Sequence, residues 1–263
     1  MKIKRLLLSL AVLAFIALGV LIAVRLDWFA EYPVRDEKPF TFHDDFEGAA
    51  TFLDLYPKDL SRWHGRQLVP EQNTIDISRE QAHSGQQSVK CFASVKRNDV
   101  TSKSDVEREQ LHFVKGDHVW SEAWFWLKAG AGSEHVFLWD LETTRKWQSP
   151  GRRVYLQKGD IIASDLGKWF SSHIFRQPHG RSSPFPTERW VRLRVHLFLS
   201  EKSDGIMEIW QDDIKVIDAR GQTLPTAKTV YDRLEVGITA NGSTAQEHTL
   251  YMDDVTISNR AFW

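Results

Sequence analysis

The feature of this sequence that most constrains its fold is an alternation of apolar and polar residues with a period of two. In residues 191–199 the odd positions are Val, Leu, Val, Leu and Leu, while Arg192, Arg194 and His196 lie between them. Similar short runs occupy residues 88–94, 118–127, 136–141, 206–210, 214–217, 234–239 and 249–257. A period of two places alternate side chains on opposite faces of a strand. The pattern predicts an all-β fold, a jelly-roll sandwich of two antiparallel sheets.

The N-terminal segment has a different pattern. An uncharged, largely apolar run over residues 6–24 follows Lys2, Lys4 and Arg5. A helix of this length would rise about 28 Å, close to the hydrocarbon thickness of a bilayer. We therefore expect a transmembrane helix as an anchor over residues 1–25, a linker over residues 26–39 and a jelly-roll domain over residues 40–263. A cleaved secretory signal is the alternative, because residues 17–19 resemble a cleavage site.

The basic residues before the apolar run favour a cytoplasmic N-terminus. We expect a single pass through the inner or plasma membrane, with the folded domain in the periplasm or outside the cell. The formal net charge of −1 gives no attraction to nucleic acid, so we expect no nucleic-acid partner. The single cysteine, Cys91, cannot form an intramolecular disulfide, so the core must hold the domain together.

Six short motifs carry a resemblance to a known fold and family. The sequences at residues 44–48, 83–88 and 251–255 resemble segments of concanavalin A-like jelly rolls, which occur in glycan-binding modules and polysaccharide lyases. The sequences at residues 103–109, 190–193 and 204–212 resemble the heparin-lyase-I-like polysaccharide lyase family. The resemblance covers nearly all of residues 40–258. It implies the jelly-roll fold, an acidic polysaccharide as ligand and lyase activity.

The chain departs from the catalytic pattern that the resemblance implies. Jelly-roll lyases of this kind commonly use a Gln-x-His strand and a Tyr, often with a Lys, on a late strand. The corresponding strand here, residues 136–142, carries Asp140 and Glu142, and the late strand at residues 234–240 has neither Tyr nor Lys. Carboxylates are expected to repel an anionic sugar. His179, Tyr155 and His196 are the candidates for a catalytic base elsewhere in the chain.

Two sets of residues are candidates for glycan binding. Arg152, Arg153, Arg176 and Arg181 lie in a loop-rich basic segment and suit bidentate contacts with uronate or sulfate groups. Trp120, Trp124 and Trp126 share one face of a predicted strand, where indole rings would stack on sugar rings. The alternatives are a solvated basic face for the first set and core packing for the second.

A structural calcium ion is a further expectation. Glu47, Asp253 and Asp254 lie in the predicted first and last strands, which are neighbours in a jelly roll, and calcium prefers such oxygen ligands. The resemblance adds that related binding modules carry calcium at this kind of position. Paired acids also cap turns, and this alternative stays open.

Three functions fit these observations. The first is a membrane-anchored, non-catalytic domain that recognises an acidic glycan or a protein partner. The second is a polysaccharide lyase that cleaves uronic-acid-containing glycans by β-elimination. The third is an accessory subunit of a membrane-protein complex, in which small residues of the apolar run would contact another helix. The missing catalytic pattern favours the first function.

Overall fold

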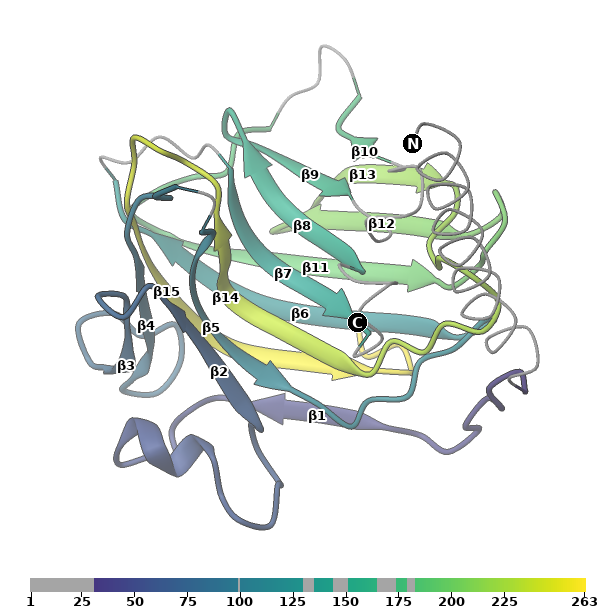
Figure 1. Ribbon diagram of the computed structural model, residues 1–263, viewed down its shortest axis with the longest axis horizontal. Helices are drawn as coiled ribbons and strands as arrows, with labels where there is room; N and C mark the ends of the chain where they lie inside the picture. Colours follow the sequence, from purple (N-terminus) through teal and green to yellow (C-terminus); the bar gives the residue numbers. More distant parts are fainter. Residues whose placement is uncertain (1–30, 99, 130–134, 144–150, 165–173, 179–182) are drawn as a thin grey trace, which may run out of the picture. The chain divides into compact units, whose positions relative to one another are not determined.

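The protein folds as two antiparallel sheets, shown in Figure 1 with β7, β8 and β14 in front of β6, β11 and β12. The computed structural model describes residues 31–98, 100–129, 135–143, 151–164, 174–178 and 183–263. One sheet has eight strands, ordered β13 (Ile214–Arg220), β12 (Ile206–Gln211), β11 (Trp190–Phe198), β6 (His118–Leu127), β15 (His248–Ser258), β4 (Ser88–Ala93) and β3 (Thr74–Ser78), with β1 (Thr41–Asp44) paired to β15.

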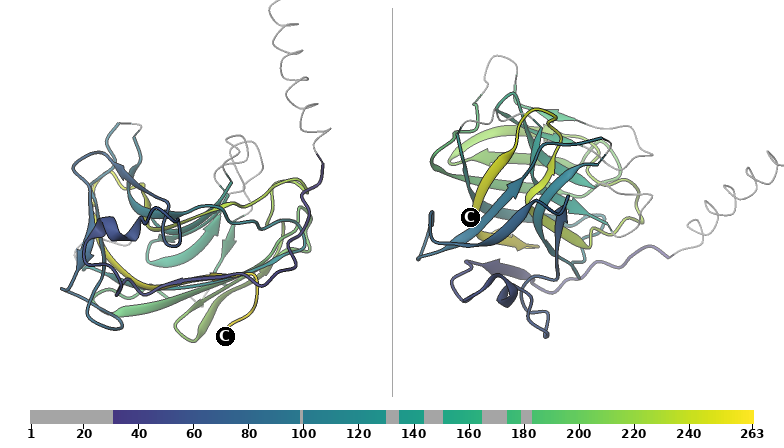
Figure 2. Two further views of the ribbon diagram at one scale, coloured as in Figure 1. Left: turned by 90° about the horizontal axis from the view of Figure 1, so that it is seen from below. Right: turned by 60° about the vertical axis from the view of Figure 1, so that its left-hand side comes forward.

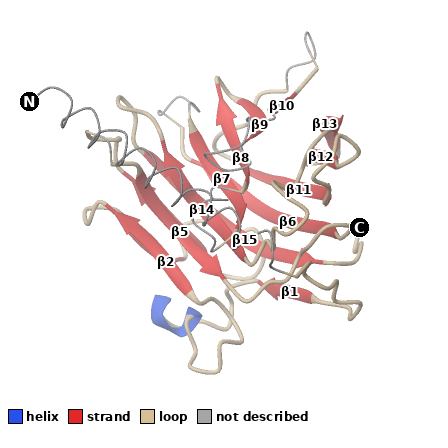
Figure 3. Ribbon diagram, turned by 45° about the vertical axis from the view of Figure 1, so that its right-hand side comes forward, coloured by secondary structure: helices blue, strands red, loops and turns tan. Residues whose placement is uncertain are grey.

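The second sheet has seven strands and is strongly bent (Figure 2). Its order is β10 (Phe175–Arg176), β9 (Asp160–Ser164), β8 (Arg152–Gln157), β7 (Val136–Glu142), β14 (Arg233–Asn241), β5 (Ser102–Arg108) and β2 (Gly65–Val69). The described helix content is one short 3-10 helix, η1 (Phe52–Leu55), drawn in blue in Figure 3. Every strand pairing between neighbours in the two sheets is antiparallel.

The core lies between the two sheets because alternate side chains point inward. On β11, Val191, Leu193 and Val195 are buried, whereas Arg192 and Arg194 lie half-buried on the outer face. Burial of a large apolar side chain contributes roughly 1.5–3 kcal/mol, so these inward rows hold the sandwich together. A buried hydrogen bond also links the sheets: Trp139 Nε1 of β7 donates to the Ser121 hydroxyl of β6 over 3.0 Å.

The predicted all-β, two-sheet antiparallel sandwich is confirmed, and the alternating runs that predicted it are strands of the two sheets. The predicted anchor at residues 1–25 lies outside the described residues. Within the described part of the chain, no helix is both long enough and apolar enough to cross a membrane.

The predicted linker, residues 26–39, is attached to the sandwich over its second half. The compact unit of the fold begins at Val34. Arg35 Nε lies 2.6 Å from Asp117 Oδ1, and Asn259 Nδ2 donates to the Lys38 carbonyl over 2.8 Å. The chain from Val34 onward is therefore part of the folded domain rather than a free tether.

Candidate active site

Strand register in the seven-stranded sheet gathers charged side chains on its outer face. The register partners from β8 through β7, β14 and β5 are Arg153, Asp140, Glu235 and Glu107, and Gly65 of β2 completes the row. Gly65 lies against Glu107, since a Cβ at this position would come within 2.4 Å of Glu107 Oε2. Five strands therefore contribute to one continuous row.

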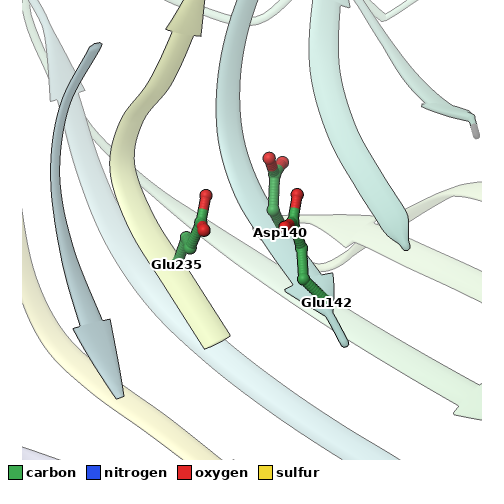
Figure 4. A group of neighbouring side chains, drawn as sticks. All are labelled: Asp140, Glu142 and Glu235. Atoms are coloured by element: carbon green, nitrogen blue, oxygen red, sulfur yellow. The ribbon is translucent and has the colours of Figure 1, made fainter. Parts of the chain in front are cut away.

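Neighbouring positions add further acids and bases on the same face. We call Asp105, Glu107, Asp140, Glu142 and Glu235 the carboxyl cluster, and Lys103, Arg153 and Arg233 the basic trio. Figure 4 shows Asp140 and Glu142 on β7 beside Glu235 on β14. The two groups interlock, so this face is a mixed ionic surface with an excess of carboxyl groups.

Arg233 joins three members of the carboxyl cluster. Its Nη2 lies 2.9 Å from Glu142 Oε2 and 3.0 Å from Glu235 Oε1, and its Nη1 lies 3.5 Å from Glu107 Oε1. Gln67 Nε2 donates to both Glu107 Oε1 and Glu235 Oε1 over 2.8 Å. These donors fix the orientation of the glutamates on three neighbouring strands.

The other two basic side chains make simpler contacts. Arg153 Nε lies 2.8 Å from Asp140 Oδ2. Lys103 Nζ lies 3.6 Å from Glu235 Oε2, which is an ion-pair distance without a hydrogen bond. Lys103 is therefore the most loosely held member of the basic trio.

Two of the acids are more deeply buried than the bases. The side chains of Asp140 and Glu235 have no exposed surface, whereas Arg153 exposes 14% of its side chain and Lys103 and Arg233 expose 22% each. A ligand that approaches this face from solvent therefore meets guanidinium and ammonium groups first. Such groups bind carboxylates well, and Arg does so with two parallel hydrogen bonds.

Burial raises the pKa of three carboxyl groups in the cluster. It raises the pKa of Glu235 to about 8, and that of Asp140 to about 6 against the opposing effect of Arg153. Asp105 is fully buried, and burial followed by the nearby Glu235 raises its pKa well above the ordinary value. A buried carboxylate without full compensation takes up a proton, so the cluster holds protons near neutral pH.

Tyr155 lies on the same face, beside the basic trio. Its ring stacks on Phe137 of β7 with a centroid distance of 4.4 Å, and the Arg153 guanidinium lies 4.1 Å from the same Phe137 centroid. Arg153 and Tyr155 are two positions apart on β8, which places both on one face. A phenol next to a carboxylate-binding cation is a suitable group for proton transfer.

Comparison with known proteins agrees with this geometry. The family model described as polysaccharide lyase matches residues 57–256, most of the chain. The chain belongs to the polysaccharide lyase family. Membership supports the lyase alternative rather than the non-catalytic recognition that the sequence favoured, and the narrower heparin-lyase-I-like assignment stays a prediction. No curated protein sequence matches the chain.

Solved structures of similar fold include other lyases. The endo-β-1,4-glucuronan lyase of the fungus Trichoderma reesei has a TM-score of 0.61 and 13% identity, over 74% of this chain and 90% of its own. The cellulose-induced protein Cip1 has a TM-score of 0.60 and 18% identity, over 83% and 97%. A variant of alginate lyase Aly36B bound to an alginate tetrasaccharide has a TM-score of 0.51 and 13% identity, over 83% and 96%. At these identities the likeness concerns the fold.

The structure separates the predicted catalytic residues of this polysaccharide lyase family member. Tyr155 lies on the outer face of the seven-stranded sheet, whereas His196 lies on the outer face of the eight-stranded sheet, across the core. His196 Nδ1 lies 2.6 Å from Glu208 Oε2, and its Nε2 lies 2.8 Å from His118 Nδ1. His179 lies outside the described residues. Tyr155 and His196 therefore do not belong to one site.

The predicted tryptophan row also lies on the eight-stranded sheet. Trp120, Trp124 and Trp126 share its outer face, as the alternation predicted. His196 stacks on Trp120 with centroids 3.9 Å apart, and His83 stacks on Trp124 with centroids 3.6 Å apart. Trp126 is buried and packs edge-on against Tyr251. The chain's own side chains thus cover ring surface that a sugar would need.

The described members of the predicted arginine set lie on one sheet but in different surroundings. Arg153 is in the basic trio, and Arg176 on β10 is exposed, with Nη1 donating to Gln157 Oε1 over 2.9 Å. Arg152 lies elsewhere, because the strand period turns it to the inner face, where it is fully buried and its guanidinium lies 4.9 Å from the Phe175 centroid. Its role in glycan binding stays a prediction. Arg181 lies outside the described residues.

The residues predicted to bind calcium hold a loop. Glu47 Oε1 accepts hydrogen bonds from the amides of Gln86 and Gln87, over 2.8 and 2.9 Å. Asp253 Oδ2 accepts from the His83 and Ser84 amides, and Asp254 Oδ2 lies 2.6 Å from His83 Nδ1. This is the turn-capping geometry that the sequence left open as the alternative. The calcium site stays a prediction.

Within the described residues, the side chains that bring three possible metal-ligand atoms within 4.8 Å of one another are Asp140, Glu142 and Glu235. Arg233 Nη2 already contacts both glutamates of this group. A guanidinium between the two carboxylates fills the space and supplies the positive charge that a cation would otherwise bring. The arrangement therefore fits an ion-pair network of protein side chains better than a metal site.

Sequence reasoning missed most of this site. Lys103, Asp105 and Glu107 alternate along β5, and Arg233 and Glu235 alternate along β14. Charged residues at a spacing of two on strands that are otherwise buried are the signal that would have identified them. Asp140 and Glu142 were noticed, but as obstacles to the reaction.

Proposed function

We propose that this protein is a lyase that cleaves uronic-acid-containing polysaccharides by β-elimination on the outer face of the seven-stranded sheet. The observation that carries the proposal is the basic trio, which lies on the solvent side of the buried carboxyl cluster and beside Tyr155. Membership of the polysaccharide lyase family supports the reaction class. The glucuronan and alginate lyases of similar fold have substrates of the proposed type.

The reaction needs three groups on the enzyme. A cationic or hydrogen-bonding group must neutralise the uronate carboxylate, so that the C5 proton becomes acidic. A base must take that proton while the C5–H electron pair forms the C4–C5 double bond and the C4–O4 bond breaks. An acid must then give a proton to the departing O4.

The proposed site has candidates for all three tasks. Arg153 and Arg233 present guanidinium groups toward solvent, which suit the uronate carboxylate. Tyr155 would remove the C5 proton as a phenolate and return a proton to O4 as a phenol, and its stacking on Phe137 holds the ring in place. The acids on β7 do not prevent the reaction, because the basic trio lies between them and solvent.

The direct test is ultraviolet absorbance of uronate polymers incubated with the purified full chain. β-Elimination leaves a conjugated unsaturated uronate, so glucuronan, alginate and polygalacturonate form a suitable panel. We expect a rise in absorbance on at least one polymer, and no rise for the Y155F variant. A folded wild-type chain that produces no rise on any uronate polymer would overturn the proposal.

We also propose that the enzyme works outside the cytoplasm, anchored by the apolar run at residues 6–24. A uronate polymer of an envelope or matrix is accessible there. Protease treatment of intact cells or spheroplasts should degrade the domain while the cytoplasmic control protein survives. Protection of the domain under these conditions would reverse the proposed orientation.

A further inference from the structure

The outer face of the seven-stranded sheet holds more carboxyl groups than bases. The carboxyl cluster has five acids and the basic trio has three cations, so full ionisation would leave two uncompensated negative charges. These charges would lie at positions with little or no solvent contact. Burying uncompensated charge is far more costly than binding a proton, so the cluster must carry protons when no cation is added.

Hydrogen-bond geometry indicates where one of these protons lies. Glu235 Oε1 already accepts from Gln67 Nε2 and Arg233 Nη2, over 2.8 and 3.0 Å. Its Oε2 is buried, and none of the described residues is within hydrogen-bond distance of it. Lys103 Nζ is 3.6 Å away from it. Oε2 is therefore the oxygen that is available for a proton.

Asp105 shows the same shortage of donors on the neighbouring strand. Both of its carboxyl oxygens are buried and lack a hydrogen-bond partner among the described residues. Carboxyl oxygens without donors, here Glu235 Oε2 and both oxygens of Asp105, are consistent with carboxyl groups that carry a proton. Protonation thus explains the unpartnered oxygens of Glu235 and Asp105, which would otherwise destabilise the buried ionic network.

We propose that Glu235 acts as a neutral carboxylic acid, and that its Oε2–H donates a hydrogen bond to the carboxylate of the bound uronate. This inference rests on the proposed lyase function and adds a group to the same site. Displacement of the loosely held Lys103 side chain would open the path to Oε2. A neutral donor binds an anion without adding charge, while Arg153 and Arg233 supply the charge.

The groups that face Glu235 determine when this donor is present. They are Lys103, Asp105 and Glu107 from β5, Asp140 and Glu142 from β7, and Arg233 on its own strand. Burial and the neighbouring acids favour the protonated form, whereas Lys103 and Arg233 oppose it. Substrate affinity should therefore decrease as the pH rises through about 8.

The first arm of the test measures the proton without requiring activity. Infrared spectroscopy of the full chain should show the C=O stretch of a protonated carboxylic acid that disappears as the pH rises through about 8. The E235Q variant should lack this change. The matched variant E208Q should keep it, because Glu208 lies on the other sheet and its carboxylate already accepts from His196 and Lys215. A wild-type spectrum without the change, or an E235Q spectrum that retains it, would overturn the inference.

The second arm measures KM on the polymer that the wild-type enzyme cleaves. The wild-type KM should rise about tenfold for each pH unit above the pKa of Glu235, because only the protonated form binds. E235Q should not show this rise, since its amide can keep the contacts at Oε1 and donate in place of Oε2–H. K103M should move the wild-type rise to higher pH, because Lys103 opposes protonation.

These arms separate the two levels of the proposal. Equal pH dependence of KM in wild type and E235Q would overturn the role of Glu235 while leaving the lyase function intact. If no polymer is cleaved but the infrared change depends on Glu235, the proposed function and the uronate ligand fail, and only the proton on Glu235 is supported.

Discussion

The outer faces of the two sheets carry similar residue types but differ in how their carboxyl groups are paired. On the eight-stranded sheet, Glu208 accepts from both His196 and Lys215, and His83 covers a face of Trp124. On the seven-stranded sheet, Asp105 has no hydrogen-bond partner within the described chain, and Lys103 reaches Glu235 only at 3.6 Å. Among the described residues, the buried polar atoms without a partner include the Nε atoms of Arg192 and Arg194 on the first face, and carboxyl oxygens of Asp105, Asp140 and Glu235 on the second. The two faces therefore differ in their carboxyl groups.

This difference suggests where a ligand acts. Side chains that already satisfy one another gain little from a ligand, because each new contact replaces an existing one. Buried polar groups without partners are costly to the folded state, and such costs are common at functional sites. We therefore assign stability to the eight-stranded face and chemistry to the seven-stranded face, and the following variants test this assignment.

The largest expected effect comes from R233M. Arg233 contacts Glu107, Glu142 and Glu235, and its removal leaves three acids without their shared cation. We expect uronate cleavage to fall by a factor of about 1,000 or more and the free energy of unfolding to fall by about 3–5 kcal/mol. Absorbance assays and urea denaturation measure the two effects.

The matched variant on the other face is R192M. Arg192 Nη2 pairs with Asp213 Oδ1, on a side chain that is 85% exposed. A solvent-exposed pair contributes about 1 kcal/mol or less, so both activity and stability should change little. A loss of activity in R192M as large as in R233M would contradict the assignment of chemistry to one face.

The next largest effect should come from Y155F. Removal of the hydroxyl leaves the stacking on Phe137 in place, so the fold should keep its stability. General acid–base groups contribute about 100- to 10,000-fold, and kcat should fall by that factor with KM nearly unchanged. The measurement is steady-state formation of the unsaturated uronate.

H196Q is the control for Y155F, because both residues are candidate bases in the sequence. His196 lies on the eight-stranded face, so its replacement should leave kcat within about twofold. If H196Q abolishes cleavage while Y155F does not, the catalytic face has been assigned to the wrong sheet.

The alternation in the sequence was enough to predict most of the fold. Every strand that it predicted is present. A period of two with apolar rows that face inward is compatible with few structures other than paired strands. The strands it did not predict include β5 and β8, where charged residues such as Asp105 and Arg153 interrupt the pattern. These charged residues lie on the outer face beside partners from other strands. The pattern of a single strand does not show such partners.

The site was less predictable than the fold, because strand register determines which of its residues are neighbours. Arg153, Asp140 and Glu235 are far apart in sequence and become neighbours only through the pairing of β8, β7 and β14. The sequence identified Tyr155 and Arg153, but it grouped Tyr155 with His196 of the other sheet and Arg153 with Arg152, which faces the core. It also interpreted the acids of β7 as repulsive, because a sequence does not reveal the burial that raises the pKa of Asp140.

A moderate effect is expected on the pH dependence of stability. The pKa of Glu235 is about 8 in the folded protein and near 4.3 in an unfolded chain, so the folded state retains a proton that the unfolded state loses. This contribution is fully present below about pH 4.3 and is lost as the pH rises through about 8, with a slope of at most about 1.4 kcal/mol per pH unit. Urea denaturation at a series of pH values should show a smaller decline for E235Q than for the wild type, and equal slopes would contradict it.

The smallest effect on activity should come from W124A. Trp124 lies between the His83 ring at 3.6 Å and the Arg192 guanidinium at 5.5 Å, so its loss should cost about 1–3 kcal/mol of stability. Retention on immobilised uronate polymer should stay unchanged in affinity electrophoresis, whereas F137A on the seven-stranded face should weaken it, because Phe137 supports Arg153 and Tyr155. If a folded W124A protein loses retention and F137A does not, the glycan lies on the indole row that the sequence predicted, and the two faces exchange roles.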